Sequence, residues 1–201
     1  MSTDGKIGWG KHTRVELRLQ FPHSKYDRIS LATTPIEILA GDERVAHASG
    51  FFWRSLTGVW LITNWHVVTG NNPFTNRALL PGQSPPSRIR FFPLLTNTTP
   101  DGKQHLPERI SLERGLFAEE VPTWQQHRDF ANLRADIVAM RVSEQPDNLT
   151  QCINEFEPVA LHHHVGADLF VVGYPLDNFE GWMPPYWKRG SFAGGPNSTN
   201  G

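Results

Sequence analysis

The chain has 201 residues, 38 % of them apolar and 19 % charged, a composition that excludes intrinsic disorder for most of its length. The net charge of −1 gives no electrostatic reason to expect nucleic acid or an anionic membrane as a partner. The 17 glycines and 16 prolines favour many short strands over long helices, so the sequence predicts an all-β fold.

The cysteine content and the N-terminus indicate where the protein works. The N-terminal residues contain no apolar signal segment, and no stretch approaches the roughly 18 apolar residues of a membrane span. A single cysteine, Cys152, excludes an internal disulfide and suits a reducing compartment. We therefore expect a soluble, cytoplasmic protein without a membrane partner, in which Cys152 is a small packed side chain rather than a nucleophile.

The first part of the chain has the pattern of an antiparallel meander. Residues 14–21 alternate polar and apolar side chains, which is the period of a half-buried strand. Residues 29–39 are rich in Ile, Leu and Thr, and a turn at Gly41-Asp42-Glu43 separates them from a strand at about 44–53. These connections are all of hairpin length.

The stretch from Gly50 to Val68 is the most informative part of the sequence. It predicts a strand, a tight turn through Thr57-Gly58, and a second apolar strand at 59–64 that runs straight into His66. A buried strand normally ends in turn residues, so an ionisable ring at its exit is unusual. This position makes His66 a candidate general base.

Proline dominates residues 71–107, which we expect to be mostly loop with one strand at 88–92. A possible edge strand at 109–112 and a helical turn near 124–130 follow. Residues 134–142 predict a compact apolar strand, with Asp136 just before its apolar run.

Beyond a break at Pro146-Asp147-Asn148, which can link two subdomains, the sequence predicts three further strands. They cover residues 156–161, 168–175 and 186–193. The last eight residues have no core-forming content.

His66 and Asp136 fit one well-known chemical arrangement. A serine hydroxyl is a poor nucleophile until a neighbouring imidazole removes its proton, and a carboxylate on the far ring nitrogen fixes the tautomer of that imidazole. Nine histidines and many carboxylates would give such an ordered pair by chance, so the local context has to support it.

That context resembles the trypsin-like serine peptidases, specifically the disulfide-free bacterial HtrA-like branch. Residues 48–52 (ASGFF) and 60–68 (WLITNWHVV) resemble the block around the catalytic histidine of that family. Residues 135–140 (ADIVAM) resemble the block around its aspartate, while 171–175 (VVGYP) and 187–191 (WKRGS) resemble two strands of its second barrel.

The resemblance covers roughly residues 30–193 and implies a chymotrypsin-like double β-barrel. It implies a serine endopeptidase that hydrolyses a protein or peptide substrate through an acyl-enzyme, with His66 as base and Asp136 as its orienting residue. Neither a metal nor an organic cofactor is implied. Residues 1–145 would form the first barrel, including a Pro-rich loop insertion at about 71–107, and 146–201 a partial second barrel with a disordered tail.

One part of the family pattern is missing, because no Gly-x-Ser-Gly turn occurs in the chain. Ser191 lies in an expected strand and Ser198 lacks flanking glycines, so neither is a good nucleophile. We expect a chain truncated before the serine motif, with an incomplete second barrel, little peptidase activity of its own, and further domains in the natural protein.

Two alternatives remain open at this stage. The chain could be a pseudo-peptidase that uses the fold as a peptide-binding or scaffolding module. The His162-His163-His164 run could suggest a metal, but two alternate histidines without a further ligand make a weak site, and a surface turn is the better interpretation.

Overall fold

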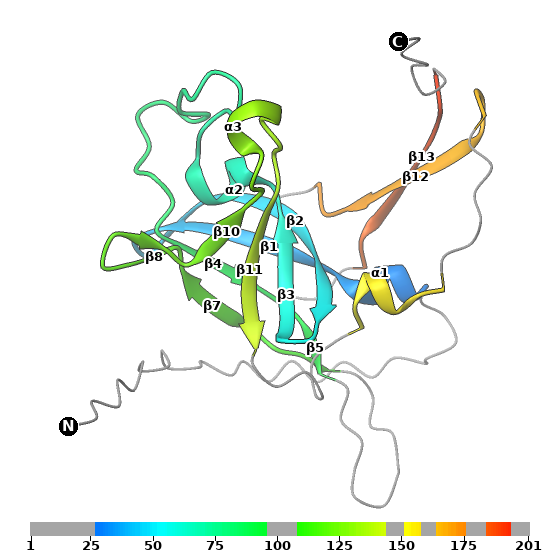
Figure 1. The fold of residues 1–201 in the computed structure, drawn as a ribbon. Coiled ribbons are helices and arrows are strands. Elements are labelled where there is room, and N and C mark those ends of the chain that lie inside the picture. The colour runs from blue at the N-terminus through cyan, green and yellow to red at the C-terminus, as the bar shows by residue number, and fades with distance from the viewer. Residues whose placement is uncertain (1–26, 96–107, 144–150, 158–163, 176–183, 194–201) are drawn as a thin grey trace, which may run out of the picture.

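The structure is a computed structural model that describes residues 27–95, 108–143, 151–157, 164–175 and 184–193 (Figure 1). It is mostly β. Seven described strands form one antiparallel sheet in the order β10-β11-β3-β2-β1-β4-β7, and this sheet curls into a half-barrel (Figure 1). The predicted all-β class is thus confirmed at this level. Three two-stranded sheets, β12-β13, β5-β6 and β8-β9, accompany it among the described residues.

Apart from β1 and β2, the strands have six residues or fewer, as the density of turn formers predicts. They are β1 (Thr33–Ala40), β2 (Glu43–Ser55), β3 (Gly58–Thr63), β4 (Arg88–Phe91), β5 (Leu94–Leu95), β6 (Glu108–Arg109), β7 (Leu112–Gly115), β8 (Phe117–Ala118), β9 (Val121–Pro122), β10 (Trp124–Gln126), β11 (Val138–Ser143), β12 (Asp168–Gly173) and β13 (Tyr186–Ser191). The described helices are α1 (Arg28–Ala32), α2 (Trp65–Thr69), α3 (Phe130–Leu133) and the 3-10 turn η1 (Ile153–Glu155).

The core fills the inner face of the curled sheet. Successive side chains of a strand point to opposite faces, and in β11 every second residue, Val138, Met140 and Val142, is buried. Phe52 of β2 and Phe91 of β4 are fully buried, with ring centroids 6.3 Å apart. The same alternation that predicts these strands therefore also defines the face that they bury.

The central hairpin of β2 and β3 forms as predicted, with a turn one residue earlier than expected. Ser55 pairs with Gly58, so the turn passes through Leu56 and Thr57. The Ser55 hydroxyl oxygen accepts hydrogen bonds from the backbone N–H of Thr57 at 3.1 Å and from Trp60 Nε1 at 2.8 Å. These two bonds stabilise the earlier turn.

Two segments differ from the predicted secondary structure. Residues 28–32, expected to be extended from 29 onwards, form helix α1, because the Asp27 carboxylate caps it by accepting the Ile29 N–H at 2.8 Å. The helical turn expected at 124–130 is wrong for its first residues, since β10 occupies 124–126 and pairs with β11. The helix, α3, begins only at Phe130.

The strands predicted at 88–92, 134–142, 168–175 and 186–193 are confirmed as β4, β11, β12 and β13, with β11 beginning only at Val138. The edge strand predicted at 109–112 is split, because β6 ends at Arg109 and β7 begins at Leu112. The predicted strand at 14–21 lies outside the described residues, as do 158–161. Residues 156 and 157 are not in a strand. No described helix is long and apolar enough to cross a membrane.

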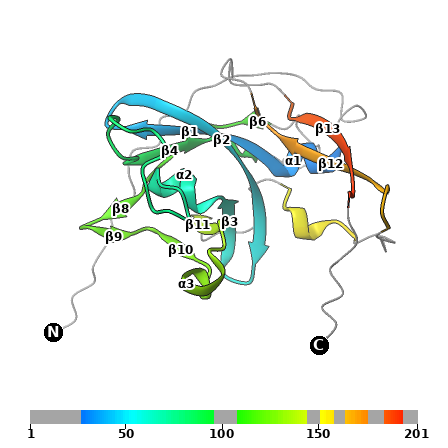
Figure 2. The same ribbon diagram turned by 90° about the horizontal axis from the view of Figure 1, so that it is seen from above.

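The β12-β13 ribbon lies beside α1, on the side of the sheet away from β8 and β9 (Figure 2). Three hydrogen bonds tie the ribbon and the adjoining Tyr174 to β2, β6 and α1. The Tyr174 N–H donates to Ser49 Oγ at 2.8 Å, Arg109 Nη2 donates to the Tyr174 hydroxyl at 3.1 Å, and Trp187 Nε1 donates to Ser30 Oγ at 2.9 Å. The division into two barrels at residue 145 remains a prediction.

Candidate functional site

His66 lies on a single helical turn rather than directly at the end of a strand. Strand β3 ends at Thr63, Asn64 is the N-cap residue, and α2 follows. Val67 and Val68 are buried in the core, which leaves the ring of His66 on the outer side of the turn with 37 % of its side chain exposed. The predicted strand leading straight into the histidine is therefore corrected to a strand, a cap and a helical turn.

A left-handed glycine ends this helical turn. Gly70 has φ +71° and donates its N–H to the His66 carbonyl at 2.8 Å. A β-carbon at this position would meet Pro86 Cδ at 2.8 Å. Glycine therefore serves both the backbone conformation and the close approach of the loop that follows.

The register of the sheet brings Asp136 to His66. Strand β11 pairs antiparallel with β3, with Val138 opposite Thr63. Continuing this register by two residues sets Asp136 opposite Trp65, next to His66. Two residues that are 70 positions apart in the chain thus meet at one end of neighbouring strands.

The Asp136 carboxylate contacts His66 at two places. Oδ2 lies 2.6 Å from the ring nitrogen Nδ1, and Oδ1 accepts the backbone N–H of His66 at 3.0 Å. A carboxylate only accepts, so Nδ1 carries the proton and Nε2 is the basic nitrogen of the neutral ring. The arrangement can hold an imidazole in one tautomer and stabilise the imidazolium that forms when Nε2 takes a proton.

Asn64 holds the carboxylate from the other side. Its side-chain Nδ2 donates to the Asp136 carbonyl at 2.9 Å and to Oδ2 at 3.3 Å. Asn64 does not cap its own helix with its side chain. The sequence analysis did not assign Asn64 to the site. Asn is common at the N-cap position because its side chain can accept a helix N–H, but here the side chain bonds to Asp136 instead.

Aromatic stacking fixes both segments that carry the pair. The indole of Trp65 stacks on the ring of Phe130 from α3, with centroids 4.8 Å apart. The Arg134 guanidinium lies over the same Phe130 ring, 5.8 Å from its centroid. Helices α2 and α3 therefore hold together next to the pair. Packed neighbours of this kind restrict the movement of the orienting groups.

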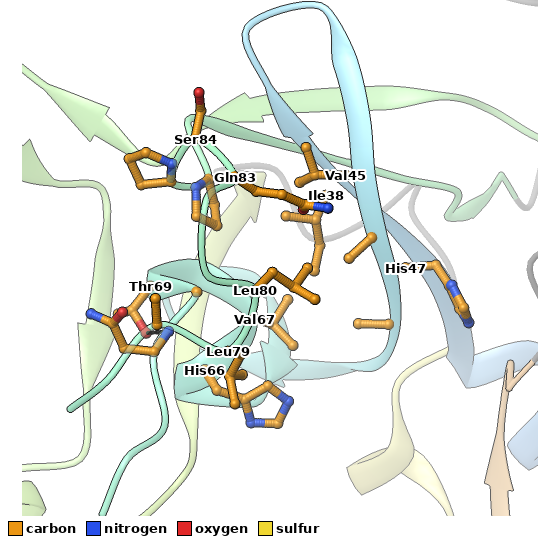
Figure 3. A pocket seen from close by; sticks show the side chains of 17 residues that line it. Ile38, Val45, His47, His66, Val67, Thr69, Leu79, Leu80, Gln83 and Ser84 are labelled. Carbon is orange, nitrogen blue, oxygen red and sulfur yellow. Dashed lines mark hydrogen bonds between the residues drawn. The ribbon is translucent and has the colours of Figure 1, made fainter. Parts of the chain in front are cut away.

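Two cavities flank the pair. One, of about 410 Å³, is lined by His66 together with the β1-β2 hairpin and the loop after α2 (Figure 3). The other, of about 250 Å³, lies on the side of Asn64 and Asp136 and reaches Val172 of β12. The imidazole is thus accessible from a cavity of the size that binds small ligands or side chains.

None of the described serines is hydrogen-bonded to the His66 ring. Ser191 is the last residue of β13 and is exposed, and Ser198 lies outside the described residues. Ser84 lines the larger cavity, but Figure 3 shows it at the opposite end from the His66 ring. The described residues therefore bring an imidazole and a carboxylate together without a serine hydroxyl bonded to the ring.

Other chemistry-bearing residues lie away from the pair. Cys152 is fully buried, and burial raises the pKa of its thiol to about 11. His164 is exposed, and the other two histidines of that run lie outside the described residues. Among the residues that the structure describes, no group of three or more His, Cys, Asp or Glu side chains is placed to hold a metal ion.

Comparison of the chain with protein-family models, curated proteins and solved structures finds no match.

Proposed function

We propose that the chain belongs to a trypsin-like serine endopeptidase of chymotrypsin-like double-barrel fold, in which His66 is the catalytic base and Asp136 its orienting residue. The observation that supports this most is the double contact of the Asp136 carboxylate, which accepts both the backbone N–H and the Nδ1–H of His66. The curled antiparallel sheet that carries both residues is compatible with the first of the two barrels.

The proposed reaction uses Nε2 of His66 as the proton acceptor and donor, and the Asp136 carboxylate as the partner of Nδ1. Nε2 of His66 takes the proton of a serine hydroxyl as its oxygen attacks the carbonyl carbon of a peptide bond. The imidazolium then gives that proton to the leaving amine, and water repeats the sequence to release the acyl group. The Asp136 carboxylate stabilises the imidazolium through the 2.6 Å hydrogen bond.

The serine has to come from residues other than those the structure describes. The 201-residue sequence contains no Gly-x-Ser-Gly, and we expect it to have little peptidase activity by itself. The proposed acyl transfer is therefore assigned to the natural protein, with this chain supplying the base, its orienting carboxylate and one wall of the site.

Labelling with a fluorophosphonate probe tests this function, because the probe reports a serine activated by a neighbouring base. We expect the natural full-length protein to be labelled and His66→Ala to lose the label. Asp136→Asn should lower the rate of labelling by about 10⁴-fold, because the ring loses its tautomer and its charge partner. The matched control is Asp129→Asn, which changes a carboxylate on the other side of α3 whose ion-pair partner among the described residues is the exposed Arg128.

Absence of labelling in the wild-type protein, or equal labelling of wild type and His66→Ala, would contradict the proposal. The favoured alternative would then be a pseudo-peptidase that binds peptides, since the cavity of about 410 Å³ beside His66 has the size of a ligand site.

A further inference from the structure

The His66 ring has one nitrogen that none of the described residues binds. Nδ1 is hydrogen-bonded to Asp136 Oδ2 at 2.6 Å, which leaves the lone pair of the neutral ring on Nε2. The side chain is 37 % exposed, so a small molecule can reach this nitrogen. A carboxylate on the far nitrogen stabilises positive charge on the ring, so Nε2 can attack an electrophilic carbon as well as take a proton.

The larger cavity beside this ring is held open by hydrogen bonds of the loop that forms its outer wall. At the start of that loop the backbone N–H of Leu79 donates to the Gly70 carbonyl at 2.8 Å, which fixes it to the end of α2. At its end the backbone N–H of Ser87 donates to the Leu39 carbonyl of β1 at 2.8 Å. The cavity of about 410 Å³ is therefore part of the folded framework.

The cavity is apolar, with the imidazole at one end. Figure 3 shows the His66 ring at that end and Ser84 at the other, with Val67 and Leu80 between them. Of the 17 residues that line the cavity, none is Asp, Glu, Lys or Arg. Leu80 is 45 % exposed. An aliphatic chain along this path would remove apolar surface from water, whereas a charged chain would lose hydration without gaining an ionic partner.

We propose that this cavity binds the acyl chain of an activated ester of an aliphatic acid, either a thioester or an aryl ester, and that His66 hydrolyses the ester without a serine. Nε2 attacks the carbonyl carbon and forms a C–N bond, while the bond to the thiolate or phenolate breaks and that group leaves with the electron pair. Water then adds to the acyl carbon, the C–N bond breaks, and a proton passes to the solvent. The products are the free acid and the leaving group.

The leaving group restricts this activity to activated esters. A peptide amine leaves only when it is protonated, and an acylated Nε2 has no proton to give. A thiolate or a phenolate leaves as an anion and needs none. Asp136 stabilises the positive charge of the acylated ring through Nδ1. The reaction therefore uses only the described residues and water, and goes beyond the proposed peptidase, which needs a serine.

Hydrolysis of p-nitrophenyl esters by the 201-residue chain tests the occupant of the cavity. We expect kcat/KM to be at least tenfold higher for the hexanoate than for the acetate, because each buried methylene favours binding by up to about fourfold. The mono-p-nitrophenyl ester of adipic acid carries a carboxylate at the far end of the same chain, and should react at least tenfold more slowly than the hexanoate. Equal values for the hexanoate and the adipate would overturn the proposal.

Substitution of His66 tests the nucleophile. The chain has nine histidines, so His66→Ala identifies which of them reacts. We expect this change to lower kcat/KM for the hexanoate at least tenfold and to abolish the preference for the longer chain. An unchanged rate would assign the reaction to another side chain and overturn the proposal.

Loop variants test the wall of the cavity. The double change Leu79→Ala and Leu80→Ala should lower kcat/KM for the hexanoate at least tenfold while the acetate, which does not need the wall, keeps its rate. Phe74→Ala is the matched control, because Phe74 lies in the same loop, is 72 % exposed and does not line the cavity. It should leave both rates unchanged. A double variant that still prefers the hexanoate would overturn the proposed occupant.

The outcomes separate this activity from the proposed function. Hexanoate-selective hydrolysis by the 201-residue chain without fluorophosphonate labelling of the natural protein supports the esterase and contradicts the peptidase. Labelling of the natural protein without ester hydrolysis by the 201-residue chain supports the peptidase and overturns the esterase. Hexanoyl p-nitroanilide, an amide, should not be hydrolysed by the 201-residue chain, and its hydrolysis at the rate of the ester would contradict the attack by Nε2.

Discussion

Three N–H groups contact the Asp136 carboxylate, and only one of them belongs to the ring that it orients. The other two are the backbone N–H of His66 and the amide of Asn64. Hydrogen bonds to a charged acceptor are stronger than neutral ones, so the carboxylate is held even if the ring moves. Two of the three donors fix the position of Asp136, and its orienting effect on the imidazole follows from that.

At the residue scale, Cys152 predicts how stability depends on pH. Burial raises the pKa of its thiol from 9.0 to about 11, Arg54 opposes the rise and Glu155 adds to it. Above pH 9 the unfolded chain loses this proton while the folded chain keeps it, so the free energy of unfolding falls as pH rises from about 9 to 11. Urea unfolding at pH 8, 9 and 10 should show a smaller fall for Cys152→Ala than for wild type. Parallel curves would contradict the prediction.

At the scale of elements, the packing of strand β2 explains why residue 50, within residues 48–52 (ASGFF), is a glycine. A β-carbon at Gly50 would meet Leu61 Cδ1 at 2.8 Å, Ile36 Cδ1 at 2.9 Å and the Ile62 carbonyl at 3.0 Å. Strand β2 therefore passes between its neighbours without room for a methyl group. We expect Gly50→Ala to destabilise the fold by about 1–3 kcal/mol, measured by urea unfolding.

The matched control for this prediction is Gly115→Ala at the end of β7. The nearest atom to a β-carbon there is the Phe117 carbonyl oxygen at 3.6 Å, an ordinary contact distance. An equal loss of stability in both variants would mean that crowding at Gly50 is not the cause.

Strands whose side chains alternate could be predicted from the sequence. The resemblance of the blocks around His66 and Asp136 implies that the two residues meet, and their side chains are in contact at 2.6 Å, whereas their catalytic roles remain a prediction. Helix α1 was missed because five residues are too few for a helical period, although Asp27 offered an N-cap signal. The sequence did not predict that Leu79 and Leu80 line the cavity beside His66, because a Pro-rich segment has no periodic pattern. The path of this loop depends on hydrogen bonds such as that from the Leu79 N–H to the Gly70 carbonyl.

At the scale of the whole molecule, the β12-β13 ribbon is exposed on both faces. Phe170 and Val171 are neighbours on β12 that point to opposite faces, and they are 54 % and 62 % exposed. Tyr186 and Trp187 on β13 are 44 % and 39 % exposed. Apolar surface of this kind on a two-stranded ribbon favours association.

We therefore expect the 201-residue chain to self-associate through this ribbon, as measured by sedimentation at increasing protein concentration. Phe170→Ser should weaken the association, because the ring lies 5.8 Å from that of Trp187 and forms part of the same apolar surface. Phe117→Ser, which changes an equally apolar side chain of 47 % exposure on β8, should leave it unchanged. A monodisperse monomer at all concentrations would contradict the expectation.

Arg109 links the exposed ribbon to the sheet at a place where water does not reach. Arg109 is 5 % exposed, and its guanidinium donates to the Phe92 carbonyl at 2.7 Å as well as to the Tyr174 hydroxyl. Burial lowers the pKa of this group, and separation of the ribbon would leave it without its phenol partner. Separating the ribbon from the curled sheet would therefore cost the buried Arg109 its hydrogen bond to Tyr174, which couples the stability of the two parts.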